Sequence, residues 1–309
     1  MTITGFLLAA APEASRIERQ ADWWAAFRTD AADWNTTLEK AVAGGFRADR
    51  LAWAFCAGYQ SALRRLFPRL AADRMASFCA TEAGGNAPKA IHARLERTGT
   101  GWRLDGEKSW ASVADPESIL YVVARSGDPA AARPELRVVA VEAGTGGISI
   151  HPMPPPGFVP EVFHARIVLE DVRVAEENVL PGDGYDAYLK PFRAIEDIHV
   201  TAAVLAYLVR EGRARQWPRP WAQQVLAVLL SLAEVDAHDF TSPPGHIALA
   251  GALGLAGDLI AQAEDFWSAV SLEDPARRRW ARDRRLLEVA STARKARIES
   301  AWRKLSGDR

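Results

Sequence analysis

The sequence predicts an α+β fold in three successive parts: helices, then strands, then helices. Two observations predict it. Before residue 75 and after residue 182, apolar residues recur three and four positions apart, which is the spacing of one helix face. Between these limits, short runs alternate apolar and polar residues and are separated by turn residues, as half-buried strands are. We therefore expect an N-terminal helical region at 1–74, a central antiparallel β-barrel domain at 75–182 and a C-terminal helical bundle at 183–309.

The N-terminal region carries large apolar side chains at helical spacing. Trp23 and Phe27 lie on one predicted helix face, and Leu63 and Phe67 lie on another. Gly44-Gly45 interrupts the pattern, so we expect a helix boundary there. We expect Pro68 to end the last helix of this region, because proline lacks the backbone donor and clashes with the preceding turn.

Strand signals follow at short intervals, and helical spacing then returns and lasts to residue 309. The proline-rich segment 152–160 is expected to be a stiff loop among the strands. The expected strands are 91–97, 102–104, 119–124, 136–142, 148–151 and 163–169. The expected helices after residue 182 are 200–209, 221–237, 247–270 and 275–305.

Charge and cysteine content exclude several classes of protein. The chain has 38 Lys and Arg residues against 39 Asp and Glu residues, so it lacks the basic excess typical of nucleic-acid binding. Cys56 and Cys79 are too isolated for a disulfide framework or a structural zinc site, which favours a cytoplasmic protein. The longest apolar run, 225–233, is shorter than the roughly 20 residues that span a bilayer, so we expect no membrane partner.

Three other patterns could indicate a site, and each has a plainer interpretation. Glu196-x-x-His199 has the spacing of carboxylate-bridged di-iron helices, but its second copy, Glu161-x-x-His164, falls in an extended segment, so we expect no metal. The arginine-rich segment 277–285 could bind a phosphate, but acidic neighbours favour a solvated helix face. Gly251, Gly254 and Gly257 lie mid-helix and favour close helix packing.

The segment 78–85, with sequence FCATEAGG, combines a strand with a glycine turn. In a strand, Phe78 and Ala80 share one face while Thr81 lies on the other. The two glycines allow the backbone to approach a ligand closely. A hydroxyl and free amides are therefore expected beside an open space.

The segment 106–112, with sequence GEKSWAS, offers an indole and a second hydroxyl. Trp110 and Ser112 are expected on the same side of a strand, about 7 Å apart. One can cover an aromatic face while the other hydrogen-bonds to its edge, so the pair suits a flat, polar-edged ring. The same residues also suit an ordinary barrel core and surface, and spacing alone does not separate these interpretations.

Together with the segment 169–182, LEDVRVAEENVLPG, these two segments resemble the middle domain of acyl-CoA dehydrogenases. The resemblance covers about 75–185, and the helices on either side agree with that family's α–β–α order. It implies FAD as cofactor, an acyl-CoA or similar thioester as substrate, and a homodimer or homotetramer. It further implies roles for five residues: Phe78, Ala80 and Thr81 line the flavin, Trp110 packs against its ring, and Ser112 bonds near N5.

The chain departs from the family pattern in its outer parts. Both helical regions are shorter than in the family, and no Gln-x-x-Gly-Gly segment, which helps to hold the FAD adenosine, precedes Arg282-Asp283. The resemblance places Ser291 where most members have the glutamate that removes the α-proton. A serine hydroxyl cannot be that base near neutral pH, because its pKa is far too high.

The resemblance also supplies another candidate base. Some branches of the family carry the glutamate on an earlier helix, and Glu196 in the segment 194–199 is in register with it. We therefore expect an FAD-dependent oxidoreductase in which Glu196 removes the α-proton and a hydride passes to flavin N5. Glu196 could instead be a carboxylate favoured by the dipole of a helix start.

Two alternative functions stay open. The chain could be a non-catalytic relative that keeps the scaffold for binding or assembly, because Ser291 replaces the usual base. It could also be a flavin-dependent monooxygenase, because relatives of this fold that use oxygen lack the usual glutamate as well.

Overall fold

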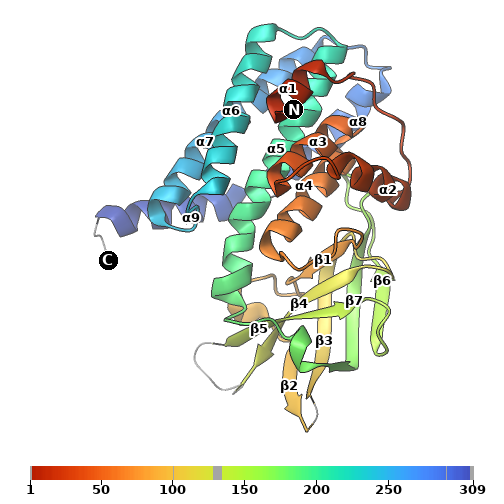
Figure 1. The fold of residues 1–309 in the computed structure, drawn as a ribbon, viewed down its shortest axis with the longest axis vertical. Helices are drawn as coiled ribbons and strands as arrows, with labels where there is room; N and C mark the ends of the chain where they lie inside the picture. The colour runs from red at the N-terminus through yellow and green to blue at the C-terminus, as the bar shows by residue number, and fades with distance from the viewer. Residues whose placement is uncertain (1, 100, 128–133, 290, 307–309) are drawn as a thin grey trace. The chain divides into compact units, whose positions relative to one another are not determined.

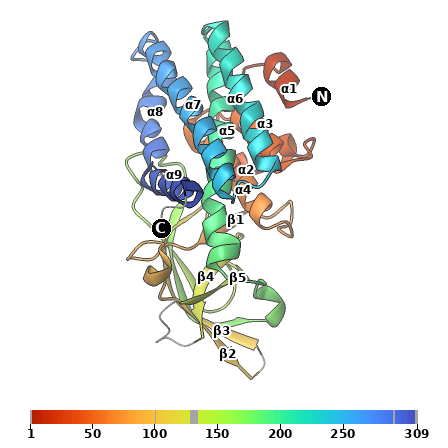
Figure 2. The same cartoon turned by 90° about the vertical axis from the view of Figure 1, so that its left-hand side faces the viewer.

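The computed structural model describes residues 2–99, 101–127, 134–289 and 291–306. The chain divides into two compact units (Figures 1 and 2). The helical unit comprises Met1–Arg65, Pro156–Glu161 and Ala194–Arg309, and the β unit comprises Leu66–Pro155 and Val162–Arg193. The order of helices, strands and helices predicted from the sequence is confirmed.

The helices have well-defined starts and ends. A capping box begins α3, in which the Glu39 backbone N–H donates to Thr36 Oγ1 at 3.1 Å and the Thr36 N–H donates to Glu39 at 3.0 Å. As predicted, α4 ends just before Pro68. The helices are α1 (Ile3–Ala9), α2 (Gln20–Ala31), α3 (Thr37–Arg47), α4 (Leu51–Leu66), α5 (Lys190–Ala214), α6 (Arg219–Ala237), α7 (Pro243–Ser268), α8 (Pro275–Asp283) and α9 (Ser291–Ser306).

The prediction that Gly44-Gly45 breaks a helix is wrong, because α3 runs through both residues. A Cβ on Gly45 would lie 2.1 Å from the carbonyl oxygen of Ala203 in α5. A Cβ on Gly58 in α4 would likewise lie 2.6 Å from Val200 Cα. These glycines therefore let helix backbones approach each other inside the helical unit.

The C-terminal helices differ from the predicted ranges in two places. The predicted helix 275–305 is divided into α8, a 3₁₀ turn at Arg284–Glu288 and α9. Close packing by Gly251, Gly254 and Gly257 is also wrong, since a Cβ on any of them would meet nothing within 4 Å. These three glycines lie on an open face of α7.

The helix α7 is long and apolar enough to cross a bilayer by length and composition, with a mean hydropathy of 1.3. In the structure, 28% of that apolar window is buried. A core helix of a soluble protein passes the same test, so α7 alone does not establish a membrane span.

The β unit holds one seven-stranded curled sheet in the order β1-β4-β2-β3-β7-β6, with β5 paired to the other edge of β4. The predicted antiparallel sheet is in fact mixed, because β1–β4 and β2–β4 are parallel. The long segment between β1 and β4 provides the crossover that a parallel pair needs. The strands are β1 (Ala76–Cys79), β2 (Arg94–Thr98), β3 (Gly101–Ser112), β4 (Ile119–Ser126), β5 (Glu135–Glu142), β6 (Ile148–Pro152) and β7 (His164–Val174).

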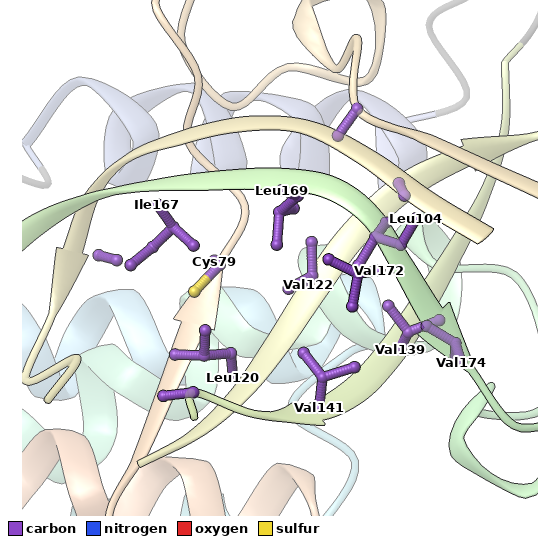
Figure 3. Packing of buried hydrophobic residues seen from close by; sticks show 14 of the residues in the cluster. Cys79, Leu104, Leu120, Val122, Val139, Val141, Ile167, Leu169, Val172 and Val174 are labelled. Carbon is purple, nitrogen blue, oxygen red and sulfur yellow. The ribbon is translucent and has the colours of Figure 1, made fainter. Parts of the chain in front are cut away.

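Apolar side chains fill the inner face of the curled sheet (Figure 3). Alternate residues of β3, β4, β5 and β7 point inward, and Leu104, Val122, Val139 and Ile167 are fully buried. The sheet therefore packs against its own strands, and this core fixes the register on which the candidate site depends.

An ion-pair network holds the segment Pro156–Glu161 in the helical unit. Glu161 accepts hydrogen bonds from Arg50 at 3.1 Å and from Arg282 at 2.9 Å, and the Val159 N–H donates to Asp283 at 2.8 Å. The predicted solvated face for 277–285 is therefore only partly correct. Arg278 is exposed, whereas Arg282 serves this network.

Candidate functional site

The two motif segments lie side by side in the β unit. Thr81 follows β1, and its carbonyl accepts a hydrogen bond from the Ser109 N–H in β3 at 2.8 Å. A short bridge between Glu82 and Gly85 closes the glycine turn, and Gly85 adopts φ 101° with open space around it. The turn therefore lies beside β3, but the Glu82 and Gly85 amides, which were expected to be free, donate to each other's carbonyls at 3.0 and 2.9 Å.

A buried ion pair holds these two segments together. Lys108 of β3 is 0% exposed and donates to the Glu82 carboxylate at 2.6 Å. The same carboxylate accepts the backbone N–H groups of His92 at 2.7 Å and Ala93 at 3.1 Å. Burial lowers the pKa of Lys108 and the negative Glu82 opposes this effect. Since a buried charge needs its partner, the pair ties the turn to β3.

Trp110 lies at a bulge in β3. The β3–β7 register shifts between Lys108 and Ala111, and Trp110 adopts φ 57° in the left-handed region. Its N–H donates to Met153 Sδ at 3.2 Å instead of to a strand partner. The indole is 47% exposed. Left-handed backbone is costly for a bulky residue, so the surrounding structure must impose this conformation on Trp110.

Ser112 and His164 are cross-strand partners in β3 and β7. Ser112 Oγ lies 3.2 Å from His164 Nδ1, and both side chains are partly buried. The Trp110 and His164 rings meet edge to face at 5.9 Å between centroids. Trp110 and Ser112 therefore both contact His164, and they lie on one side of the strand as predicted.

The remaining residues predicted to line a flavin differ in exposure. Thr81 is partly exposed. Phe78 is 8% exposed and packs against Phe67 and Phe192, and Ala80 is also buried. Phe78 and Ala80 are thus part of the buried interior, while Thr81, Trp110 and Ser112 are partly or largely exposed.

Glu196 lies in α5 of the helical unit. The helix dipole favours carboxylates in the first turn of a helix. Because α5 begins at Lys190, Glu196 lies beyond that turn. Burial raises the pKa of Glu196 to about 8, the neighbouring Asp197 adds to this, and Arg294 opposes it. Among the described residues, Glu196 makes no hydrogen bond or ion pair. It is a half-buried carboxyl that titrates near neutral pH.

The neighbours of Glu196 are fixed by their own partners. Asp197 is buried and binds Arg294 Nε at 2.8 Å and an Arg297 terminal nitrogen at 2.7 Å. His199 donates from Nδ1 to the Ile195 carbonyl at 2.8 Å, so its Nε2 accepts from Thr37 Oγ1 at 2.9 Å. Both ring nitrogens of His199 are therefore engaged. Within the described ranges, no group of three or more His, Cys, Asp or Glu could hold a metal ion.

Sequence comparison finds relatives for part of the chain. It is 28% identical over 139 residues to cyclohexane-1-carbonyl-CoA dehydrogenase of Syntrophus aciditrophicus, covering 44% of the chain and 36% of that protein. It is 30% identical over 150 residues to a probable medium-chain specific acyl-CoA dehydrogenase of Caenorhabditis briggsae, covering 46% of the chain and 36% of that protein. The matched region thus spans 36% of the length of both curated relatives. No protein-family model matches the chain.

The fold comparison agrees over most of the chain. Butyryl-CoA dehydrogenase from Megasphaera elsdenii superimposes with a TM-score of 0.74 at 15% identity, covering 93% of this chain and 90% of that one. Glutaryl-CoA dehydrogenase from Mycobacterium smegmatis, in complex with FADH2, superimposes with a TM-score of 0.63 at 13% identity, covering 99% and 92%. At identities this low, the two superpositions show a shared fold and nothing more.

Over the matched region the sequence is similar to acyl-CoA dehydrogenases, and the chain has the fold of that family. The predicted α+β architecture of that family is thereby confirmed, with the mixed sheet as its correction.

Ser291, which the sequence resemblance places where most acyl-CoA dehydrogenases have the glutamate, is an exposed residue that begins α9. One turn later, Arg294 binds Asp197 beside Glu196. The start of α9 and the middle of α5 are therefore neighbours within the helical unit.

Sequence reasoning missed two parts of this candidate site. Neither the Glu82–Lys108 pair nor the contact of His164 with Ser112 was predicted. The first could have been suspected, because an isolated lysine inside a strand needs a buried partner. The second depends on the register of β3 and β7, which the bulge at Trp110 shifts.

Proposed function

We propose that this chain is an FAD-dependent dehydrogenase of acyl-CoA or a similar thioester. The proposal rests on Glu196. Burial, and after it the neighbouring Asp197, raise the pKa of this carboxyl to about 8. A general base works best when its pKa lies near the operating pH. A carboxyl in this range is a stronger base than an ordinary one, as removal of a weakly acidic α-proton requires.

The residues at the end of β3 fit a flavin ring. A flat ring needs an aromatic face and hydrogen-bonding groups along its edge, and the half-exposed indole of Trp110 with the Ser112 hydroxyl offers both. The open space at Gly85 permits close approach of the turn backbone. We propose that Thr81, Trp110 and Ser112 contact the ring, with Phe78 and Ala80 in the buried interior.

The proposed reaction balances around the substrate. The Glu196 carboxylate takes the α-proton, the α C–H electron pair becomes the new carbon–carbon double bond, and the β-hydrogen leaves with its electron pair. FAD, when bound, would accept that hydride at N5. The neighbouring Asp197 is engaged in ion pairs with Arg294 and Arg297.

The proposal assigns flavin binding to the Trp110–Ser112 edge and proton removal to Glu196, and flavin bleaching tests both. Purified chain is incubated with FAD, and the two-band flavin spectrum is followed as acyl-CoA thioesters are added without oxygen. Bleaching should occur, and its rate should rise with pH through about 8, because Glu196 must be ionised. Failure to bind FAD would refute the proposal.

Substitution then separates the base from the scaffold. Glu196→Gln should retain bound FAD but slow bleaching by about 10²- to 10⁴-fold, since it cannot accept the proton. The matched control is Glu299→Gln, which changes an exposed carboxylate of α9 in the same unit and should bleach normally. Equal rates in both variants would show that Glu196 is not the base.

The same assay distinguishes the alternatives. Bound flavin that no thioester bleaches supports a non-catalytic relative, and oxygen consumption driven by NADH or a reductase supports a monooxygenase.

We further propose a homodimer or homotetramer in the cytoplasm, with an electron acceptor that reoxidises the flavin. Light scattering of the purified chain measures the oligomeric state.

A further inference from the structure

His164 was assigned no role by the sequence pattern, yet it is the partner of Ser112. The two residues are paired in the β3–β7 register, and Oγ lies 3.2 Å from Nδ1. Side chains of cross-strand partners lie on the same face, so the imidazole approaches the hydroxyl from the side of β7. Ser112 thus shares its hydroxyl with an imidazole.

Neighbouring contacts fix the position of the imidazole. The Met153 N–H donates to the His164 carbonyl at 2.9 Å, and Met153 Sδ accepts the Trp110 N–H at 3.2 Å. The Trp110 ring meets the imidazole edge to face, with an interplanar angle of 68°. The imidazole therefore has little freedom to leave Ser112.

A serine hydroxyl has one proton, and the imidazole decides where it points. When Nδ1 is unprotonated, it accepts the hydroxyl proton, and Ser112 offers a ligand only its lone pairs. When Nδ1 carries a proton, it donates to Oγ, and the hydroxyl proton is free to point at a ligand. The two states of His164 thus give Ser112 opposite hydrogen-bonding polarity.

The charged side chains on the surrounding strands do not pair with His164, so the protonation of its Nδ1 depends on the imidazole itself. On β3 and β7, Glu107 and Arg166 pair with each other at 2.9 Å, and His151 of β6 is exposed opposite Arg166. Within the described part of the chain, His164 has no ion pair, and its Nε2 has no hydrogen-bond partner. Burial lowers the pKa of His164, so the neutral form predominates at neutral pH.

We propose that His164 is a positioning residue that sets whether Ser112 donates to, or accepts from, the edge of the flavin. The proposal rests on the proposed binding of FAD at this edge. Oxidised N5 needs a donor and reduced N5–H needs an acceptor, so a partner that can do either lets one hydroxyl serve both forms.

The test measures the dissociation constant of oxidised FAD by quenching of its fluorescence, across about pH 5 to 8. Wild-type affinity should rise about three- to tenfold toward low pH, which is the worth of one hydrogen bond, because protonated His164 frees the hydroxyl proton. His164→Asn should hold the affinity near its low-pH value at every pH, since its amide donates without titrating. His164→Phe removes the acceptor of the hydroxyl proton, so it should also bind with near low-pH affinity at every pH. Ser112→Ala has no hydroxyl and should bind weakly with no pH dependence.

The matched control is His151→Asn, an exposed histidine of the neighbouring strand, which should keep the wild-type profile. A wild-type pH profile of FAD affinity in His164→Asn or in Ser112→Ala would overturn the inference. Binding of FAD by His164→Asn shows that this variant is folded. Absence of FAD binding in the wild type would overturn both proposals. A pH profile as expected, without bleaching by any thioester, would support this inference while the proposed dehydrogenation fails.

Discussion

The β unit and the helical unit each present one candidate reactive group, and they prepare it by different means. In the β unit, Ser112 is held by a direct contact to His164 at a strained bulge. In the helical unit, the Glu196 side chain makes no hydrogen bond among the described residues, and burial together with the neighbouring Asp197 raises its pKa. The first group is prepared by short-range geometry, and the second by its electrostatic surroundings. Changes in the β unit should therefore affect stability at every pH, whereas changes at Glu196 should appear as a pH dependence.

The largest expected effect is at the buried ion pair of the β unit. Lys108→Met should destabilise the fold by about 3–5 kcal/mol, because it leaves the Glu82 carboxylate buried without its cation. Denaturant unfolding followed by circular dichroism measures the loss. As a control, Arg166→Met breaks the exposed pair with Glu107 and should cost less than about 1 kcal/mol. Equal losses would contradict a special role for Lys108.

The second prediction concerns the pH dependence of stability at Glu196. Its pKa is about 8 in the folded chain against 4.5 for the ordinary group, so between these values the folded state holds a proton that the unfolded state releases. Stability from this group is therefore lost as pH rises through that window. Glu196→Gln should be more stable than wild type by about 1–3 kcal/mol at about pH 8.5, allowing for partial solvation, and nearly equal at about pH 5.

Thermal unfolding at both pH values measures this difference between the variant and the wild type. Glu299→Gln, at an exposed carboxylate, should follow the wild type at both. A constant difference between Glu196→Gln and wild type would show that packing, and not titration, is responsible.

The smallest expected effect is at the strained bulge. Asparagine adopts left-handed backbone at low cost, so Trp110→Asn should stabilise the β unit by about 1 kcal/mol while weakening FAD binding. Trp110→Phe keeps both the strain and an aromatic face, so its stability and FAD affinity should stay near wild type. Loss of stability in Trp110→Asn would mean that the indole contributes more by packing than the backbone loses by strain.

Local patterns predicted most of the fold. The helix predicted at 221–237 is α6 (Arg219–Ala237), and the strand predicted at 119–124 lies within β4 (Ile119–Ser126). These elements follow from periodicity and from turn residues nearby in the chain. Gly45 was misread because its role depends on the Ala203 carbonyl of another helix, which no local pattern contains. The parallel pairing of β1 with β4 was missed for the same reason.

The candidate site could be predicted from the sequence to about the same extent as the fold. Alternation placed Trp110 and Ser112 on one side, although the strand reaches that arrangement through a bulge and not through regular pairing. His164 could not be found from spacing, because the shift between Lys108 and Ala111 sets its partner. The role of Glu196 stays a prediction, since its raised pKa gives it a suitable basicity and not a substrate.

The segment Pro156–Glu161 has a consequence for how the chain is made. Its Glu161 binds Arg50, which precedes it by 111 residues, and Arg282, which follows it by 121. As the ribosome synthesises the chain, all residues of the β unit have emerged soon after Arg193, but the ion network still lacks Arg282. The β unit can therefore fold during translation. The helical unit is completed later, because the ion pair between Glu161 and Arg282 can form only after Arg282 has been synthesised.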